Sequence, residues 1–321
     1  MRLLLLTFLL FSPLCFGKTV VVIESYHGGY KWDADYVAAV KSVLGTKHDI
    51  HVLELDTKRL KKSEWPQKVA EIQQAVASIQ PDVAILGDDN AFTLMSEHLV
   101  SQQIPVVFLG VNGGPEQHPT LNHPLVTGIL ERPFFGESIR HLRKVLKKNE
   151  RFLVLMDDSP TMRNAVNEYF GDERQPTLYG SRLDIVLTND KQTWLESVFN
   201  AHYRYDAIVV GTYHTIRDEN DNYAPPKEIM TEAYNRAQVP IFSFWDIFVG
   251  EQAGIGGFTV SAHQEGLTAA RLASMILNGM KPDRIPQMKS LSGHYVYSRS
   301  GMEHWDLKLS SLISSQSNFV D

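Results

Sequence analysis

The stretch Ile23-Glu24-Ser25-Tyr26-His27-Gly28-Gly29-Tyr30-Lys31-Trp32-Asp33 joins a strand to a helix. The apolar, β-branched run 19–23 before it is typical of a buried strand, and residues 34–44 after it have the apolar spacing of a helix. In a parallel α/β sheet, such a turn lies at the carboxyl edge of the strands, where ligands bind. The aromatic and polar side chains of this stretch therefore predict one wall of a binding site.

Strands and helices continue to alternate after this unit. Apolar strand patterns at 49–56, 81–87 and 104–110 are separated by helical patterns. After a loop rich in Gly, Pro, Asn and His, the alternation starts again, with strands expected at 151–156, 182–187, 205–210 and 239–244. This succession predicts an α/β protein with two doubly wound parallel-sheet lobes, because right-handed crossovers place helices on both faces of each sheet.

The chain is expected to pass between the lobes three times. The crossings follow the short strand 125–129, the glycine-rich run 254–259 and the amphipathic helix 262–277, after which one extended stretch, 291–297, remains. We expect a three-strand hinge beside an interlobe cleft. The predicted parts are a first lobe of 18–129 plus 260–284, a second lobe of 130–259 plus 285–300, and a C-terminal segment of 301–321.

The first residues have the features of a secretory signal peptide. Arg2 supplies a positive charge, 3–11 is apolar, and Cys15-Phe16-Gly17 fits a cleavage site, so 1–17 is predicted to be removed and the mature protein to lie in the periplasm. A lipid-attachment role for Cys15, the single cysteine, is an alternative, although Ser12-Pro13-Leu14 lacks the small residue expected before it. No later apolar run is long enough to cross a bilayer, so we expect no direct membrane insertion after cleavage.

The composition excludes several classes of partner. The chain has 321 residues, 43% of them hydrophobic and 21% charged, with a formal net charge of -6. An acidic chain has no electrostatic footprint for nucleic acid. The sequence also lacks the GxSxG, HExxH and Gly-rich phosphate-loop motifs, and its histidines lack metal-ligand spacing. We expect no enzyme activity, no cofactor and no metal site.

Candidate ligand-binding residues follow from their places at the carboxyl ends of the predicted strands. Aromatic faces with a few fixed polar groups suit a small ring-bearing or sugar-like ligand. The alternative for the aromatic residues is core packing, and for Asp88 to Asn90 and Asp158-Ser159 it is helix capping. The candidates are Ser25, Tyr26, Trp32, Asp88, Asp89, Asn90 and Asn112 from the first lobe, and Asp158, Ser159, Tyr213, His214, Trp245 and Asp246 from the second.

Two groups of residues carry a resemblance to a known family. The blocks 239–243, 249–254 and 278–286 resemble type I periplasmic solute-binding proteins, in the ABC-transporter branch that includes aromatic-amino-acid binders. The opening stretch, with Asp89-Asn90-Ala91 and the loop 217–222, is similar to the receptor domains of bacterial sensor kinases. The resemblance implies a periplasmic protein that closes on one small polar organic ligand, amino-acid-like or sugar-like, and delivers it to a membrane permease. The alternative is a receptor that signals through a separate membrane histidine kinase.

Overall fold

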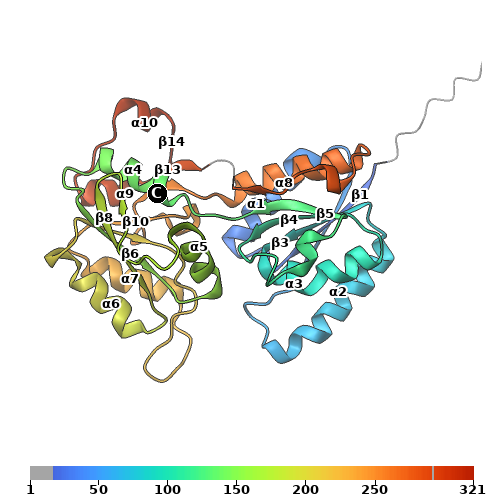
Figure 1. Ribbon diagram of the computed structural model, residues 1–321, viewed down its shortest axis with the longest axis horizontal. Helices are drawn as coiled ribbons and strands as arrows, with labels where there is room; N and C mark the ends of the chain where they lie inside the picture. The colour runs from blue at the N-terminus through green and yellow to red at the C-terminus, as the bar shows by residue number, and fades with distance from the viewer. Residues whose placement is uncertain (1–16, 291–292) are drawn as a thin grey trace, which may run out of the picture.

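The computed structural model describes residues 17–290 and 293–321. Two α/β lobes lie side by side and are joined by several passages of the chain (Figure 1). Cys15 and the rest of the predicted signal peptide, apart from Gly17, lie outside the described residues. Within the described part, no helix combines the length and apolar character needed to span a bilayer.

The first lobe is built on a sheet of six parallel strands. Their order across the sheet is β12-β5-β4-β3-β1-β2. Every residue of β3 and β4 is buried, as expected for central strands covered by helices on both faces. The strands are β1 (Thr19–Glu24), β2 (Asp49–Glu54), β3 (Val83–Gly87), β4 (Val106–Val111), β5 (Val126–Leu130) and β12 (Met288–Lys289).

Helices cover the two faces of this sheet. One face packs against α1 (Lys31–Leu44) and α8 (Ala262–Leu277), and the other against α2 (Trp65–Ile79) and α3 (Asp88–Ser101) (Figure 1). The close approach of α8 to α1 requires a glycine, because a Cβ at Gly266 would lie 2.5 Å from the Tyr36 carbonyl oxygen. Short 3-10 helices lie in the connections at η1 (Lys62–Glu64), η2 (Pro119–Asn122) and η5 (Pro282–Arg284).

The second lobe repeats this design with a five-stranded sheet. Its order is β10-β9-β6-β8-β7, and only β7 runs antiparallel within it. The strands are β6 (Arg151–Met156), β7 (Thr177–Leu178), β8 (Ser181–Leu187), β9 (Ala207–Val210) and β10 (Ile241–Ser243). The helices are α4 (Phe135–Val145), α5 (Pro160–Phe170), α6 (Lys191–Phe199) and α7 (Pro226–Arg236), with η3 (Ala201–Tyr203) and η4 (Asp246–Phe248).

A third, three-stranded sheet carries the end of the chain. Strand β11 (Gly256–Thr259) pairs antiparallel with β13 (His294–Ser298), which pairs in parallel with β14 (Ser317–Val320). The helices α9 (Arg299–His304) and α10 (Ser311–Ser315) connect β13 to β14. The C-terminal segment is thus tied into the second-lobe side of the molecule through β13 and β14 (Figure 1).

The last passage between the lobes differs from the expected one. Residues 285–300 were expected in the second lobe, but Met288 and Lys289 pair with Ile129 and Leu130 in the first-lobe sheet. The Ser290 backbone N–H also donates to the Leu130 carbonyl, at 3.0 Å. The crossing therefore follows Ser290. A two-residue strand is too short to give a periodic signal in the sequence, which explains the error.

Candidate functional site

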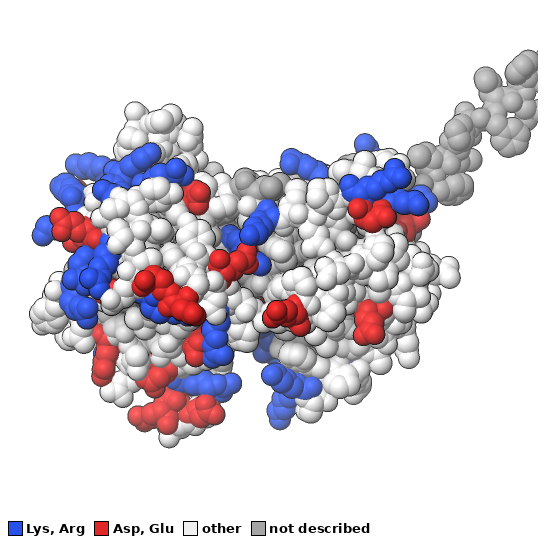
Figure 2. Space-filling view, in the orientation of Figure 1, with Lys and Arg blue, Asp and Glu red and all other residues white. Residues whose placement is uncertain are grey.

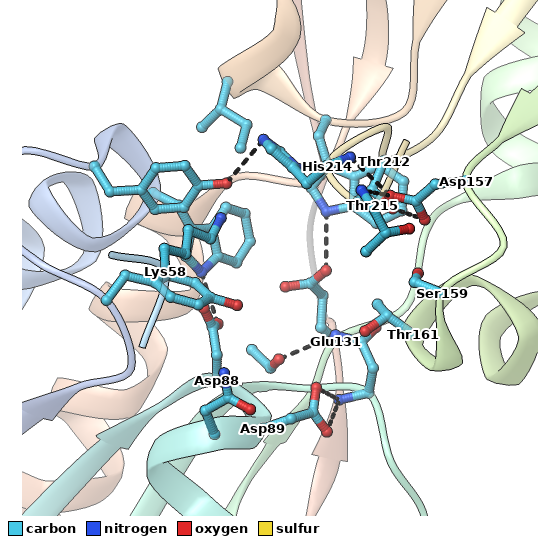
Figure 3. Close-up of a pocket in the computed structure, with 18 of the residues that line it drawn as sticks. Lys58, Asp88, Asp89, Glu131, Asp157, Ser159, Thr161, Thr212, His214 and Thr215 are labelled. Atoms are coloured by element: carbon cyan, nitrogen blue, oxygen red, sulfur yellow. Dashed lines mark hydrogen bonds between the residues drawn. The ribbon is translucent and has the colours of Figure 1, made fainter. Parts of the chain in front are cut away.

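Strand-end side chains from both lobes meet in a cavity of ≈ 380 Å³ between the lobes. A notch between the lobes is visible at the lower edge of the space-filling view (Figure 2). The cavity is lined by segments that follow β1 to β5 on one side and β6, β9 and β10 on the other (Figure 3). All of these segments begin at the carboxyl ends of strands, so two parallel sheets face one site.

Nine of the predicted site residues lie together in this cavity. Their meeting follows from the sheet topology, although contact with a ligand stays a prediction. They are Tyr26, Trp32, Asp88, Asp89, Asn90 and Asn112 from the first lobe, and Ser159, His214 and Trp245 from the second.

Ser25 and Tyr213 support the cavity from behind. The Ser25 side chain is fully buried; its hydroxyl donates to the Gly87 carbonyl at 2.5 Å and accepts from the Ala91 backbone N–H at 2.8 Å. Tyr213 is buried and stacks on His214, with ring centroids 5.6 Å apart. Ser25 thus fixes the start of α3, and Tyr213 orients a ring that lines the cavity.

Asp158 and Asp246 have partners of their own in the second lobe. The Asp158 carboxylate accepts two hydrogen bonds from the Arg163 guanidinium, at 2.5 and 2.8 Å. The Asp246 carboxylate lies 3.0 Å from His294 Nε2. Neither carboxylate lines the cavity, although both residues follow the carboxyl end of a strand. A neighbouring basic side chain holds each of them outside the cavity.

The two tryptophans among the predicted site residues each donate a hydrogen bond to a carboxyl group. Trp32 is only 4% exposed, and its indole N–H donates to Asp88 Oδ1 at 2.8 Å. Trp245 is only 2% exposed, and its indole N–H donates to Glu131 Oε1 at 2.9 Å. The sequence predicted these rings as ligand-stacking faces, whereas the structure gives each indole N–H a fixed acceptor.

Asp88 is held in an unusual backbone conformation. Its φ is 68°, a left-handed value that is uncommon for a residue with a Cβ. Gly110, also at φ 68°, lies beside it, and a Cβ there would approach Asp88 Oδ1 to 2.1 Å. Such local strain is typical of binding sites, where the surrounding structure holds a side chain in one place.

Asp89 organises the first-lobe loop after β4. Its carboxylate accepts from the backbone N–H groups of Asn112 and Gly113, at 3.1 and 2.9 Å. His118 Nε2 lies 2.8 Å from the same carboxylate. Asp89 therefore fixes the loop that carries Asn112 into the cavity wall.

Asp157 organises the second-lobe loop after β9, as Asp89 organises the loop after β4. It accepts from the Thr212 hydroxyl at 2.8 Å and from the backbone N–H groups of His214 and Thr215, at 2.8 and 3.3 Å. Ser159 begins α5 beside it, and its hydroxyl accepts from the Met162 backbone N–H at 3.3 Å. Ser159 thus caps a helix and lines the cavity at once.

Three residues central to the cavity were missed at the level of sequence. Tyr30 lies in the opening stretch, and its hydroxyl is 3.4 Å from His214 Nε2 of the other lobe. Lys58 follows β2, and strand-end position alone would have selected it. Glu131 lies on the first passage between lobes, where the sequence signalled a crossover but gave no indication that the side chain turns inward (Figure 3).

Burial and mutual proximity raise the pKa values of two cavity carboxyl groups, Asp88 and Glu131. Desolvation raises the pKa of Asp88 to about 8, and the charges of Asp89 and Glu265 add to it, against the Trp32 hydrogen bond. Desolvation and the nearby carboxylates of Glu265 and Asp88 also raise the pKa of Glu131 well above its usual range. The pKa of His214 is lowered to about 3 by burial and by the Lys58 charge. An uncharged His214 therefore faces a cluster of acids that resist simultaneous ionisation.

The described residues hold no group of three or more His, Cys, Asp or Glu side chains arranged to bind a metal ion. The loop at 217–222 is closed by its own hydrogen bonds. Asp218 Oδ1 accepts from the backbone N–H groups of Asn220 and Asn222, at 2.9 and 2.8 Å.

Comparisons with known proteins agree with this geometry. The family model described as ABC transporter substrate binding protein matches residues 44–320. No curated protein matches the sequence significantly. A Streptococcus pneumonia ABC domain in complex with L-Trp superposes with a TM-score of 0.63 at 15% identity, covering 95% of this chain and 100% of that chain.

Two further solved structures share the fold. One is the ligand-free, open form of a substrate binding protein with adhesive properties from Clostridium difficile, with a TM-score of 0.69, 12% identity and coverage of 95% and 99% of the two chains. The other is a carbohydrate transporter solute binding protein from Agrobacterium Radiobacter in complex with D-arabinose, with a TM-score of 0.55, 10% identity and coverage of 94% and 99%. The predicted fold, two α/β lobes of the type I periplasmic binding protein kind, is confirmed.

Proposed function

Because this chain belongs to the ABC transporter substrate binding protein family, we propose that it captures one small polar organic solute, amino-acid-like or sugar-like, in the interlobe cavity and delivers it to an ABC permease in the membrane. The observation that carries the proposal is a single cavity lined from both lobes. A solute held there contacts two bodies at once, so its binding favours the closed arrangement of the lobes. The same mechanism needs an extracytoplasmic protein, as the predicted signal peptide implies.

Thermal-shift screening against amino acids, sugars and nucleosides tests the proposal. One class of solute should raise the melting temperature, and calorimetry should give one site per chain. Asn90→Ala in the first lobe and His214→Ala in the second should each weaken binding, because both residues line the cavity. His263→Ala, at an exposed position on α8, is the matched control. If no solute binds while one is chemically converted, the protein is an enzyme and the proposal fails.

Sensing through a separate membrane kinase is the second candidate. The observation behind it is the opening stretch, whose sequence resembles sensor receptor domains and which contributes Tyr26, Tyr30 and Trp32 to the cavity. Deleting the gene separates the candidates. Loss of uptake of the bound solute supports delivery, whereas normal uptake with a lost transcriptional response to that solute supports sensing.

A further inference from the structure

The charges that line the cavity are unbalanced. Asp88, Asp89, Glu131 and Asp157 bring four carboxyl groups, and Lys58 is the one Lys or Arg among the described lining residues. His214, with its lowered pKa, adds no positive charge at neutral pH. Asp88 and Glu131 have raised pKa values, and each can ionise when a cation lies beside it, so a cavity of this composition favours positive charge over negative charge.

Two of the four carboxyl groups already have several partners, and two do not. Asp89 and Asp157 each accept hydrogen bonds from backbone N–H groups of their own lobe. Asp88 and Glu131 are each held through one oxygen by an indole N–H, from Trp32 and Trp245. Among the described residues, the second oxygen of each has no hydrogen-bond donor. These two carboxyl groups are fixed in orientation and keep acceptor capacity for a ligand.

Lys58 shows where a cation rests in this cavity. Its ammonium nitrogen lies 4.0 Å from the centroid of the Tyr26 ring and 3.5 Å from that of Tyr30. The two rings meet edge to face, with centroids 5.1 Å apart and an interplanar angle of 82°. Both distances are well inside the range for cation–π attraction, which reaches about 2 kcal/mol where the cation is desolvated.

This lysine is held more by aromatic faces than by ion pairs. No carboxylate of the described residues lies within ion-pair distance of its nitrogen, although Asp88, Asp33 and Asp157 act on it from farther away. The side chain keeps a solvent-exposed face, and desolvation by the surrounding protein still lowers the pKa of Lys58 to about 8. A long, flexible side chain from a loop can leave such a place without unfolding either lobe.

We propose that the solute carries a positively charged nitrogen, which replaces the Lys58 ammonium between Tyr26 and Tyr30 and pairs with Asp88 and Glu131, two carboxyl groups that ionise when the cation binds beside them. This inference rests on the solute-binding function proposed above. Lys58 then acts as an internal competitor that fills the cation site while the cavity is empty. In the opposite role, Lys58 binds a carboxylate of the solute. Replacing Lys58 would then lower the affinity for the solute, whereas removal of a competitor raises it.

Calorimetric titration with two charge series tests the inference. Tyramine, tyrosine and 3-(4-hydroxyphenyl)propionate share an aromatic skeleton, and putrescine, 4-aminobutyrate and succinate share an aliphatic one. Any solute found by the broader screen is taken through the same variants. Members with a cationic nitrogen should bind. Lys58→Met should increase the affinity for these compounds about tenfold, since the competing cation is gone. Lys62→Met, at an exposed position, should change nothing.

Glu131→Gln gives the complementary result, because it keeps an acceptor for Trp245 but cannot ionise beside a bound cation. The affinity for cationic solutes should fall about tenfold. Circular dichroism of each variant confirms that it is folded. The inference is overturned if Lys58→Met weakens the bound solute, or if the solute that binds is neutral or anionic; either result leaves the solute-binding function standing. If no solute of any charge binds, both proposals fail.

Discussion

Individual carboxyl groups decide the character of this cavity. Asp88 combines a left-handed backbone, a hydrogen bond from Trp32 and a glycine neighbour that leaves room for its oxygen. Glu131 combines 5% exposure with a hydrogen bond from Trp245. In both cases an indole N–H fixes the acid. Both tryptophans also line the cavity, so their contact with a ligand stays a prediction.

The raised pKa of Asp88 predicts how stability depends on pH. The carboxyl ionises near its usual value of 3.8 in the unfolded chain and at about 8 in the folded protein. Between these values the folded state binds more protons, so the free energy of unfolding decreases as pH rises. The melting temperature of the solute-free protein should fall between about pH 5 and about pH 8. The ionisable groups that act on Asp88 are Asp33, Lys58, Asp89, Glu131 and Glu265.

Asp88→Asn should reduce this fall, because Asn keeps an acceptor for Trp32 and tolerates the left-handed backbone without ionising. Part of the slope should persist, since burial also raises the pKa of Asp33 to about 9 and that of Glu265 to about 7. Asp283→Asn, on the exposed η5, is the control. Parallel melting curves for Asp88→Asn and the unchanged protein would contradict the assignment.

At the scale of elements, the start of α3 determines the first-lobe wall. This helix begins at Asp88 directly after β3, so the two acids and Asn90 leave the sheet edge in one turn. The Ser25 hydroxyl, on the loop after β1, bridges the end of β3 and the Ala91 N–H. Neighbouring strands β1 and β3 are thereby locked at the point where the site begins.

Ser25→Ala should therefore lower the free energy of unfolding by about 1–2 kcal/mol, the usual effect of losing a buried cap. Ser101→Ala, which removes an exposed hydroxyl bonded to His98 at the other end of α3, should have little effect. Chemical denaturation of both variants measures the difference. Equal midpoints for the two would mean that Ser25 does not stabilise this junction.

At the scale of the whole molecule, pairs of polar side chains join the two lobes around the cavity. Gln117 of the first lobe and Asn164 of α5 exchange amide hydrogen bonds at 3.3 and 2.7 Å. On the hinge side, the Glu168 carboxylate forms ion pairs with Arg132, at 2.5 Å, and with Lys289, at 2.7 Å. Polar contacts of this kind between lobes are compatible with hinge motion.

Asn164→Ala should favour the open arrangement by removing both amide bonds across the cleft. Exposed hydrogen bonds contribute about 0.5–1.5 kcal/mol, so solute affinity should fall about two- to tenfold, mainly through faster release. Asn167→Ala, one turn along α5, removes only a contact to Arg174 in the same lobe and is the control. Stopped-flow release rates and the radius of gyration from small-angle scattering measure the effect. An unchanged release rate would show that this pair does not hold the lobes together.

The sequence by itself determined the alternating architecture and the edge at which the site lies. Strand and helix periodicities are local, and in parallel sheets the carboxyl ends of strands necessarily share one edge, so Tyr26, Asp88, Asn112 and His214 could be placed together. Only the tertiary structure decided which groups face the cavity. Asp158 and Asp246 found basic partners nearby, whereas Lys58 settled against two tyrosine rings.

The tertiary structure also decided the chemistry of the opening stretch. Its Trp32 became the donor that orients Asp88, and its Tyr26 and Tyr30 became the aromatic resting place of a cation. Side-chain direction, desolvation and mutual distance arise from contacts between segments far apart in the chain. Local sequence patterns carry none of that information, which is why the position of the site was predictable and the arrangement of its charged groups was not.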